Sequence, residues 1–462
     1  MRKIFQSALV IALLLAPSRA WAHAHLKRSD PAADSRVSSL LLAIRLWFTE
    51  RPELSMSSAS LKDADGNEVV MMLPEAGRPG DNEIHFRLSA PLLPGRYVLA
   101  WRTAASDGHP SRGSFGFTVV GEAAVTPLGS ASTSPIAVRG SEGNGQKQTS
   151  RSQTGVGEEE EDAASPANSL ARALLFTALL AVIGVVAFRV LVLPRARTVS
   201  SELCQKIARR AAAFGQLASG VVIFVSLVRL YLEARMMGAM PGMPGPSLNQ
   251  IVMQTLWGYA FMIQVAAAVL ALVAFSLAVR GMRIGWTIAT ISAAVLAITP
   301  ALGGHAASSP RFTSLLISAD FLHVLGGASW LGSLLCVMLI GVPMALTTEG
   351  GDRWGNIASL VNSFSPVALG SATLVVASGI LASWIHLEHL SSFWTTNYGK
   401  TLLLKLLLVG CILIIGAYNF RRVQPQLVKE EGVARLRKSA GTELAVGFLI
   451  LLVTGLLTGI SP

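Results

Sequence analysis

The chain is poor in cysteine and in charged residues, and both shortages exclude broad classes of protein. Its 462 residues include only three cysteines, Cys204, Cys336 and Cys411, and no C-x-x-C motif. Because none precedes residue 204, we expect no disulfide framework in the N-terminal part. Charged residues make up 14% of the chain and apolar residues 52%, with a mean hydropathy of +0.52. This composition indicates a polytopic membrane protein.

The chain also lacks the signatures of a nucleotide-driven pump and of a nucleic-acid-binding protein. No Gly-x-x-x-x-Gly-Lys-Ser/Thr motif is present, so we expect no use of ATP. The formal charge of +11 does not predict a nucleic-acid partner, because the Lys and Arg residues cluster beside apolar segments. We expect no enzymatic activity.

The first 22 residues have the pattern of a secretory signal peptide. Two basic residues precede an apolar run over residues 8–16, and Ala20 and Ala22 give the small-x-small pattern of a cleavage site. Cleavage after Ala22 would make His23 the N-terminus of the mature chain.

An N-terminal histidine offers two nitrogen ligands to one metal ion, its α-amine and its imidazole Nδ1. A later loop carries Asp107 and His109, whose side chains can complete a nitrogen-rich tetragonal site typical of Cu(II). His25 is a minor candidate ligand, since it alternates with His23 along an extended segment. The alternative interpretation is two surface histidines beside an ordinary cleavage site, followed by an ordinary turn.

Residues 23–120 are expected to form an all-β sandwich. Short alternating or aromatic-rich runs are separated by turn residues rich in Gly, Pro, Asp and Asn. The expected strands cover residues 41–49, 58–62, 68–73, 83–88, 96–103 and 114–120. His85 falls within one of these strands, where a structural role is expected.

Residues 121–168 are expected to be a disordered linker. They are rich in Gly, Ser, Thr, Gln and Ala, contain an acidic run over residues 158–162, and have almost no aromatic residues. Such a segment buries too little apolar surface to fold. It would tether the β domain to residues 169–462.

The remainder contains eight apolar segments close to the length that spans a bilayer. These segments cover residues 170–193, 211–232, 256–279, 284–302, 314–341, 365–385, 401–420 and 442–460. Basic residues concentrate in the loops after the first, third and seventh segments, and the positive-inside rule places those loops in the cytoplasm. We therefore expect a multi-pass protein of a bacterial inner membrane, in contact with lipid, whose N-terminal domain is periplasmic.

All eight histidines then lie outside the cytoplasm or within the membrane. Asp320 and His323 are spaced i, i+3 on one helix face, and ionisable groups at such depth are usually functional. His305, His386 and His389 lie at the outer ends of segments, where they can converge with His323. This distribution favours a metal handled from the outside inward, although each histidine alone could be structural.

Four methionines stand in eight residues of the second outward loop: Met236, Met237, Met240 and Met243. Thioethers are soft ligands suited to Cu(I). The alternative is packing or lipid contact by flexible methionine side chains.

These motifs resemble a known family. The stretch from His23 to Ser35, together with Asp107 and His109, is similar to CopC, a periplasmic copper-binding Greek-key β-sandwich. The membrane half resembles CopD in its Gly304-His305 pair and its run from His323 to Gly332, and the fused arrangement resembles YcnJ-type copper proteins. The resemblance implies Cu(II) capture by His23, Asp107 and His109.

We therefore expect a protein that binds periplasmic Cu(II) and passes copper to a membrane His/Met site. Whether the membrane domain holds the copper as Cu(I) is an open alternative. Periplasmic copper chaperones are candidate partners. Two alternatives stay open. One is a copper-resistance or buffering module without transport. The other is a haem-binding redox protein, because histidines in a helical bundle can ligate haem.

Overall fold

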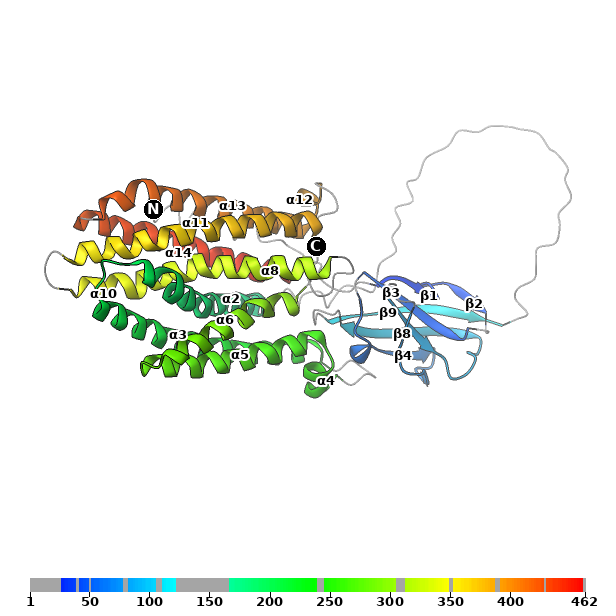
Figure 1. The fold of residues 1–462 in the computed structure, drawn as a ribbon. Helices are drawn as coiled ribbons and strands as arrows, with labels where there is room; N and C mark the ends of the chain where they lie inside the picture. The colour runs from blue at the N-terminus through cyan, green and yellow to red at the C-terminus, as the bar shows by residue number, and fades with distance from the viewer. Residues whose placement is uncertain are drawn as a thin grey trace, which may run out of the picture.

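The computed structural model combines a β-sandwich with a helical bundle (Figure 1). The structure describes residues 26–38, 41–49, 51–77, 82–104, 110–121, 166–238, 245–304, 312–348, 352–386, 391–427 and 429–459. The expected signal segment and most of the expected linker lie outside these residues.

The β domain consists of two sheets. One has the strand order β1-β3-β7-β6 and the other the order β2-β9-β8-β4-β5. Strand β2 runs parallel to β9, and the other pairings are antiparallel. The strands are β1 (Leu26–Asp30), β2 (Arg36–Ser38), β3 (Ala43–Phe48), β4 (Ser58–Asp63), β5 (Glu68–Val69), β6 (Glu75–Ala76), β7 (Glu83–Arg87), β8 (Gly95–Ala104) and β9 (Pro110–Val120).

Alternating apolar side chains produce the core of the sandwich. On β3, Ile44, Leu46 and Phe48 are 0%, 1% and 3% exposed, because every second residue of a strand faces the opposite sheet. Phe48 packs edge-on against Trp101 of the other sheet, with ring centroids 5.2 Å apart. Burying each such side chain contributes about 1.5–3 kcal/mol. The predicted β-sandwich is confirmed.

The membrane part contains eight helical segments, among the described residues, that are long and apolar enough to span a bilayer. The eight segments are built on α2 (Pro166–Ala187), α3 (Ser201–Met236), α5 (Leu256–Val279), α6 (Arg283–Leu302), α8 (Thr313–Gly327), α11 (Asp352–His386), α13 (Asn397–Tyr418) and α14 (Glu430–Leu457). The predicted number of spans is confirmed. Helix α2 begins at Pro166, inside the expected linker, and proline is well suited to the first turn of a helix.

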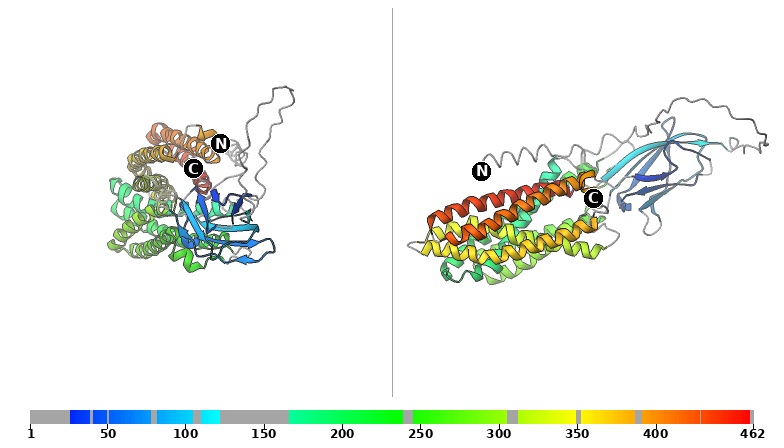
Figure 2. Two further views of the ribbon diagram at one scale, coloured as in Figure 1. Left: turned by 90° about the vertical axis from the view of Figure 1, so that its right-hand side faces the viewer. Right: turned by 90° about the horizontal axis from the view of Figure 1, so that it is seen from above.

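Short elements complete the bundle, and several continue a long helix with a π-helical turn. They are η3 (Phe188–Val192), η4 (Leu193–Arg195), α4 (Leu248–Met253), η5 (Ala328–Gly332), α9 (Ser333–Cys336), η6 (Val337–Gly341), α10 (Val342–Leu346), α12 (Ser392–Thr395), η7 (Asn419–Val423) and η8 (Gln424–Gln426). One further short helix, η1 (Leu54–Met56), lies in the β domain between β3 and β4. The helices run roughly along one direction, and the β domain continues beyond one end of the bundle (Figure 2).

Helix α2 lies in the centre of the bundle. In the most apolar stretch of the α2 span, 72% of the residues are buried inside the protein. The corresponding share for the α11 span is 17%. Gly184 of α2 and Gly332 at the end of η5 contact each other through backbone atoms. A Cβ on either residue would overlap the backbone of the other helix. This pair of glycines lets two spanning helices approach as closely as their backbones allow.

The three cysteines are free thiols. Cys336 is fully buried and packs within the core of the bundle. Cys411 is exposed on the surface of α13.

Candidate copper site and family

One end of the β-sandwich gathers the chain positions that flank the expected Cu(II) ligands. Leu26, where β1 begins, pairs with Phe48, where β3 ends. Phe48 in turn packs on Trp101, three residues before the end of β8. The segment before β1 and the segment between β8 and β9 are therefore attached to the same end of the domain.

Most of the predicted ligands themselves lie outside the described residues, so their assignment stays a prediction. These are His23, His25, Asp107, His109, His305, His389, Met240 and Met243, together with the side chain of His386.

The same end of the sandwich contacts the helical bundle. An apolar cluster spans the two parts and consists of Met56, Ala104, Met237, Ile251 and Trp257. Hydrogen bonds accompany it: Arg102 Nη1 donates to the Gly238 carbonyl at 3.4 Å, Ser55 Oγ donates to the Gln254 carbonyl at 3.1 Å, and the Leu256 N–H donates to the Glu53 carboxyl. Ala104 directly precedes the segment that carries Asp107 and His109. We call this contact the junction.

The two described methionines of the predicted Met cluster, Met236 and Met237, both make contacts within the protein. Met237 is 2% exposed and packs within the apolar cluster of the junction. The sulfur of Met236 accepts a hydrogen bond of 2.7 Å from Asn168 Nδ2. In this arrangement the two side chains connect helices.

His85 has the structural surroundings expected of it. It lies on β7 with its Nε2 2.7 Å from Glu83 Oε1. Its neighbours across the sheet are Arg45 on β3 and Glu75 on β6, far from the ends of the strands that form the junction.

A cavity of about 1130 Å³ lies in the half of the bundle nearer the β domain. All eight spanning helices contribute to its lining. Its polar or aromatic lining residues include Arg172, Arg229, Glu233, Trp257, Gln264, Thr299, Asp320, His323, Trp330, Tyr398 and Lys405. We call it the central cavity. Trp257 belongs both to its lining and to the junction.

His323 is oriented within this cavity by a serine. Its Nδ1 lies 3.0 Å from Ser378 Oγ on α11, and the Ser378 hydroxyl donates to the Leu374 carbonyl at 2.7 Å. Because that hydroxyl proton is already committed, Ser378 accepts from Nδ1–H. The unprotonated nitrogen is then Nε2, and this nitrogen is available to a metal ion.

Charged side chains surround His323. Asp320 acts electrostatically on Lys405 and Tyr398, and Lys405 acts on His323. Among the described residues, no three His, Cys, Asp or Glu side chains are grouped as a metal site. A copper ion at His323 would need further ligands from water or from residues beyond the described ranges.

The flanks of the other predicted membrane ligands do border the central cavity. Gly304, next to His305, is a lining residue, as is Ile385, next to His386. His323 also lines it. The described neighbours of His305 and His386 therefore line the same cavity as His323, and the assignment of His305 and His386 as ligands stays a prediction.

A cluster of buried charges near the junction was missed in the sequence. Arg229 is subject to the fields of Arg172 and Glu233, and its guanidinium carbon lies 5.8 Å from the ring centroid of Trp257. A signal was present, because Arg229 and Glu233 are spaced i, i+4 within an apolar segment. Gln264 was missed too; it donates to Ser226 Oγ at 2.7 Å.

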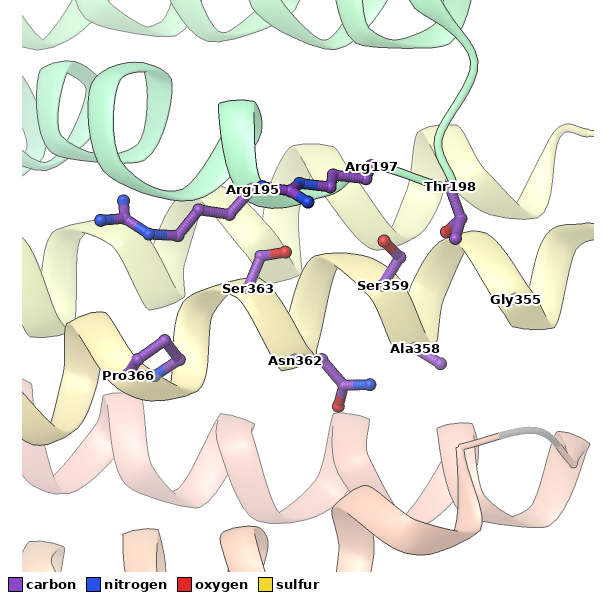
Figure 3. Close-up of a pocket in the computed structure, with 9 residues that line it drawn as sticks. All are labelled: Arg195, Arg197, Thr198, Gly355, Ala358, Ser359, Asn362, Ser363 and Pro366. Atoms are coloured by element: carbon purple, nitrogen blue, oxygen red, sulfur yellow. The ribbon is translucent and has the colours of Figure 1, made fainter.

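A smaller pocket of about 430 Å³ lies at the far end of the bundle, between the loop after α2 and helix α11 (Figure 3). Its lining residues are Arg195, Arg197, Thr198, Gly355, Ala358, Ser359, Asn362, Ser363 and Pro366. The hydroxyls of Ser359 and Ser363 point toward the arginine-bearing segment. Two arginines without a carboxylate, thiol or imidazole repel cations, so this lining does not suit copper.

Comparison with protein-family models places three domains on the chain. Residues 26–120 match the CopC domain, residues 162–310 match the Copper resistance protein D-like N-terminal domain, and residues 358–457 match Copper resistance protein D.

Individual relatives agree with these matches. Copper transport protein CutJ of Bacillus subtilis is 25% identical over 458 residues, covering 98% of this chain and 76% of its own. Copper resistance protein C of Xanthomonas campestris pv. juglandis is 32% identical over 26% of this chain and 96% of its own. Copper resistance protein D of Pseudomonas syringae pv. tomato is 26% identical over 52% of this chain and 80% of its own.

A copper-binding type of β-sandwich, eight spanning helices and matching domains in the same order lead to one conclusion: this multi-pass membrane protein belongs to the copper resistance and transport family in which a CopC domain is fused to a CopD-type membrane domain.

Proposed function

We propose that the protein captures Cu(II) outside the inner membrane with its β domain and delivers copper through the central cavity toward the cytoplasm. His23, Asp107 and His109 form the capture site in this proposal, with His25 nearby. The observation that carries it is the junction, because the end of the sandwich to which these ligands are attached contacts Trp257 at the central cavity. Copper is the cargo.

The arrangement of charges supports a short transfer. A copper ion released at the junction meets the Glu233 carboxylate and then, deeper, Asp320 and His323 Nε2. Carboxylate and imidazole are ligands that accept Cu(II), and the neighbouring arginines and lysine limit how strongly the cation is held. Weak intermediate binding favours passage over storage.

The orientation in the membrane follows from the basic loops. With the β domain in the periplasm, the pocket that contains Arg195 and Arg197 faces the cytoplasm, as the positive-inside rule requires. Periplasmic copper chaperones are then the natural donors of the metal. No redox step is part of the proposal.

Transport is tested with the processed full-length protein in proteoliposomes, with copper added outside and a copper-sensitive dye inside. We expect copper entry in the wild type and a loss of at least roughly tenfold in His323→Ala, because removing a ligand removes a binding step. The matched control is His85→Ala, a histidine far from the cavity, which should leave entry unchanged.

Two outcomes would reject parts of the proposal. Full entry in His323→Ala would remove His323 from the path. Tight binding without entry in the wild type would instead establish a buffering or resistance module. A haem absorbance band in the purified protein would instead support the haem alternative.

A further inference from the structure

Glu443, in the middle of α14, is a buried carboxylate within the membrane part. It is 3% exposed, and among the described residues it forms no ion pair. Its oxygens accept two hydrogen bonds from neutral donors: Trp330 Nε1 to Oε1 at 3.0 Å and Asn419 Nδ2 to Oε2 at 2.9 Å. A carboxylate without a counter-ion is costly at this depth, so such residues usually carry a function.

The neighbours of this carboxylate are uncharged. Helix α14 packs against α2, α9, α11, α13 and the η7–η8 segment. Within the described part of these elements, the hydrogen-bond partners of Glu443 are the neutral side chains of Trp330 and Asn419. The charged residues of the neighbouring η7 turn, Arg421 and Arg422, are exposed on the surface. The charge state of Glu443 is therefore set by its own proton or by a cation that arrives.

The carboxamide of Asn419 can form a hydrogen bond with Glu443 in both the ionised and the protonated state of Glu443. In the structure its Nδ2 donates to the carboxylate, and its Oδ1 is buried without a hydrogen-bond partner. When Glu443 is protonated, a half-turn of the carboxamide brings Oδ1 to the carboxyl, which then donates its O–H. The carboxamide therefore keeps one hydrogen bond to Glu443 in either protonation state, donating to the carboxylate or accepting from the carboxyl.

Trp330 connects this pair to the copper path. Its indole lines the central cavity, whereas Glu443 and Asn419 do not. His323 on α8 and Trp330 on η5 belong to the same spanning segment, and both line the central cavity. A cation that moves inward from His323 therefore reaches Trp330, whose N–H holds the carboxylate behind it.

We propose that Glu443 is a proton-binding site that couples copper movement to proton movement, an inference that rests on the proposed function. As a copper ion reaches Trp330, the Glu443 carboxyl releases its proton outward, and the positive charge of the ion replaces that of the proton. Once copper has left toward the cytoplasm, the carboxylate takes up a proton from that side. One proton leaves the cytoplasm per copper ion, with no change in oxidation state.

The experiment uses the full-length protein in proteoliposomes with a copper-sensitive and a pH-sensitive dye inside. In the wild type, we expect copper entry to be accompanied by proton exit and to be faster when the interior is acid. Glu443→Gln keeps the size and hydrogen-bonding capacity of the side chain but cannot release a proton. It should lose the proton signal and the dependence on the pH gradient. Glu431→Gln, on the exposed first turn of the same helix, should behave as the wild type.

A second measurement separates this inference from the proposed function. In detergent, infrared difference spectra on adding copper should show loss of a protonated carboxyl band in the wild type, and none in Glu443→Gln. Copper entry without proton movement in the wild type, or a carboxyl band unchanged by copper, would overturn the inference while leaving transport intact. If the carboxyl band responds to copper but the protein moves no copper, transport and its coupling to protons are rejected. Glu443 would then still be a proton-binding site that responds to copper.

Discussion

At the scale of single residues, the tautomer of His323 decides which of its two nitrogens is available to copper in the central cavity. Imidazole binds a metal through an unprotonated nitrogen, and the other nitrogen must carry the proton. Ser378 fixes that choice by accepting from Nδ1, since its own proton is donated to the Leu374 carbonyl. Residues that orient a ligand in this way are nearly as important as the ligand.

Ser378→Ala removes the acceptor and leaves His323 in place. We expect the copper affinity of the membrane part to fall by roughly 10- to 100-fold, the usual effect of losing a ligand-orienting hydrogen bond. The measurement is copper binding to the full-length protein in a His109→Ala background, which removes a proposed ligand of the β domain. Thr373→Ala, an exposed hydroxyl on the same helix, is the control. Equal affinities in both variants would contradict the orienting role.

At the scale of helices, small residues set how closely the spans approach. The carbonyl of Leu180 and the backbone of Gly184 occupy the space that a Cβ on Gly332 would need. Backbone atoms cannot rotate away as a side chain can, so an added methyl must push the two helices apart.

Gly332→Ala should therefore destabilise the bundle by about 1–3 kcal/mol, the usual cost of overpacking. Gly370→Ala on α11 meets no atom within 4 Å and is the matched control. It should be neutral or stabilising by up to about 1 kcal/mol. Thermal unfolding in detergent compares the two, and a shared unfolding temperature would show that the contact tolerates a methyl group.

The elements that the sequence predicted well are those with long, regular patterns. Eight apolar segments of spanning length gave eight helices, and strands such as β3 and β8 followed from alternating or aromatic-rich residues. The short strands β1, β2 and β6 were not predicted, because two to five mostly polar residues show no clear period. They form through pairing with other strands: β1 with β3, β2 with the distant β9, and β6 with the nearby β7.

The site was only partly predictable for the same reason. His323 was predicted to be functional because it is an ionisable residue in an apolar segment, and the structure places it in the lining of the central cavity. The hydrogen bonds of Ser378 and Asn419 join helices separated by tens of residues, and a serine or asparagine carries no local signal of such a role. Only the packing of the bundle brings these groups together.

At the scale of the whole molecule, the junction holds the β domain over the central cavity with few contacts. It comprises one apolar cluster and a few hydrogen bonds involving Ser55, Arg102 and Glu53, which is modest for two parts that exchange an ion. A contact of this kind is easily shifted by a single charge. Glu53 supplies such a charge, since it lies half-buried beside Leu256, at the start of α5.

Burial at the junction raises the pKa of Glu53 above its ordinary value, and the Arg51 charge and the Leu256 N–H oppose this rise. A carboxyl whose pKa rises on docking takes up protons as the parts associate. Docking should therefore strengthen as the pH falls from neutral through the raised pKa of Glu53. At a pH above that pKa, where Glu53 is ionised, docking should be weaker. A more acidic periplasm would favour contact between the two parts.

Glu53→Gln should make docking independent of this titration and several-fold tighter at neutral pH, because the neutral amide avoids the cost of burying a charge. Energy transfer between dyes on Asp65→Cys and Leu248→Cys, with Cys204 and Cys411 replaced, reports the docked fraction at each pH. Glu75→Gln breaks only an exposed ion pair with Arg87 and should keep the wild-type pH dependence. If Glu53→Gln titrates like the wild type, another group controls the junction. If the wild type docks more weakly as the pH falls, the sign of the linkage argued from burial is wrong.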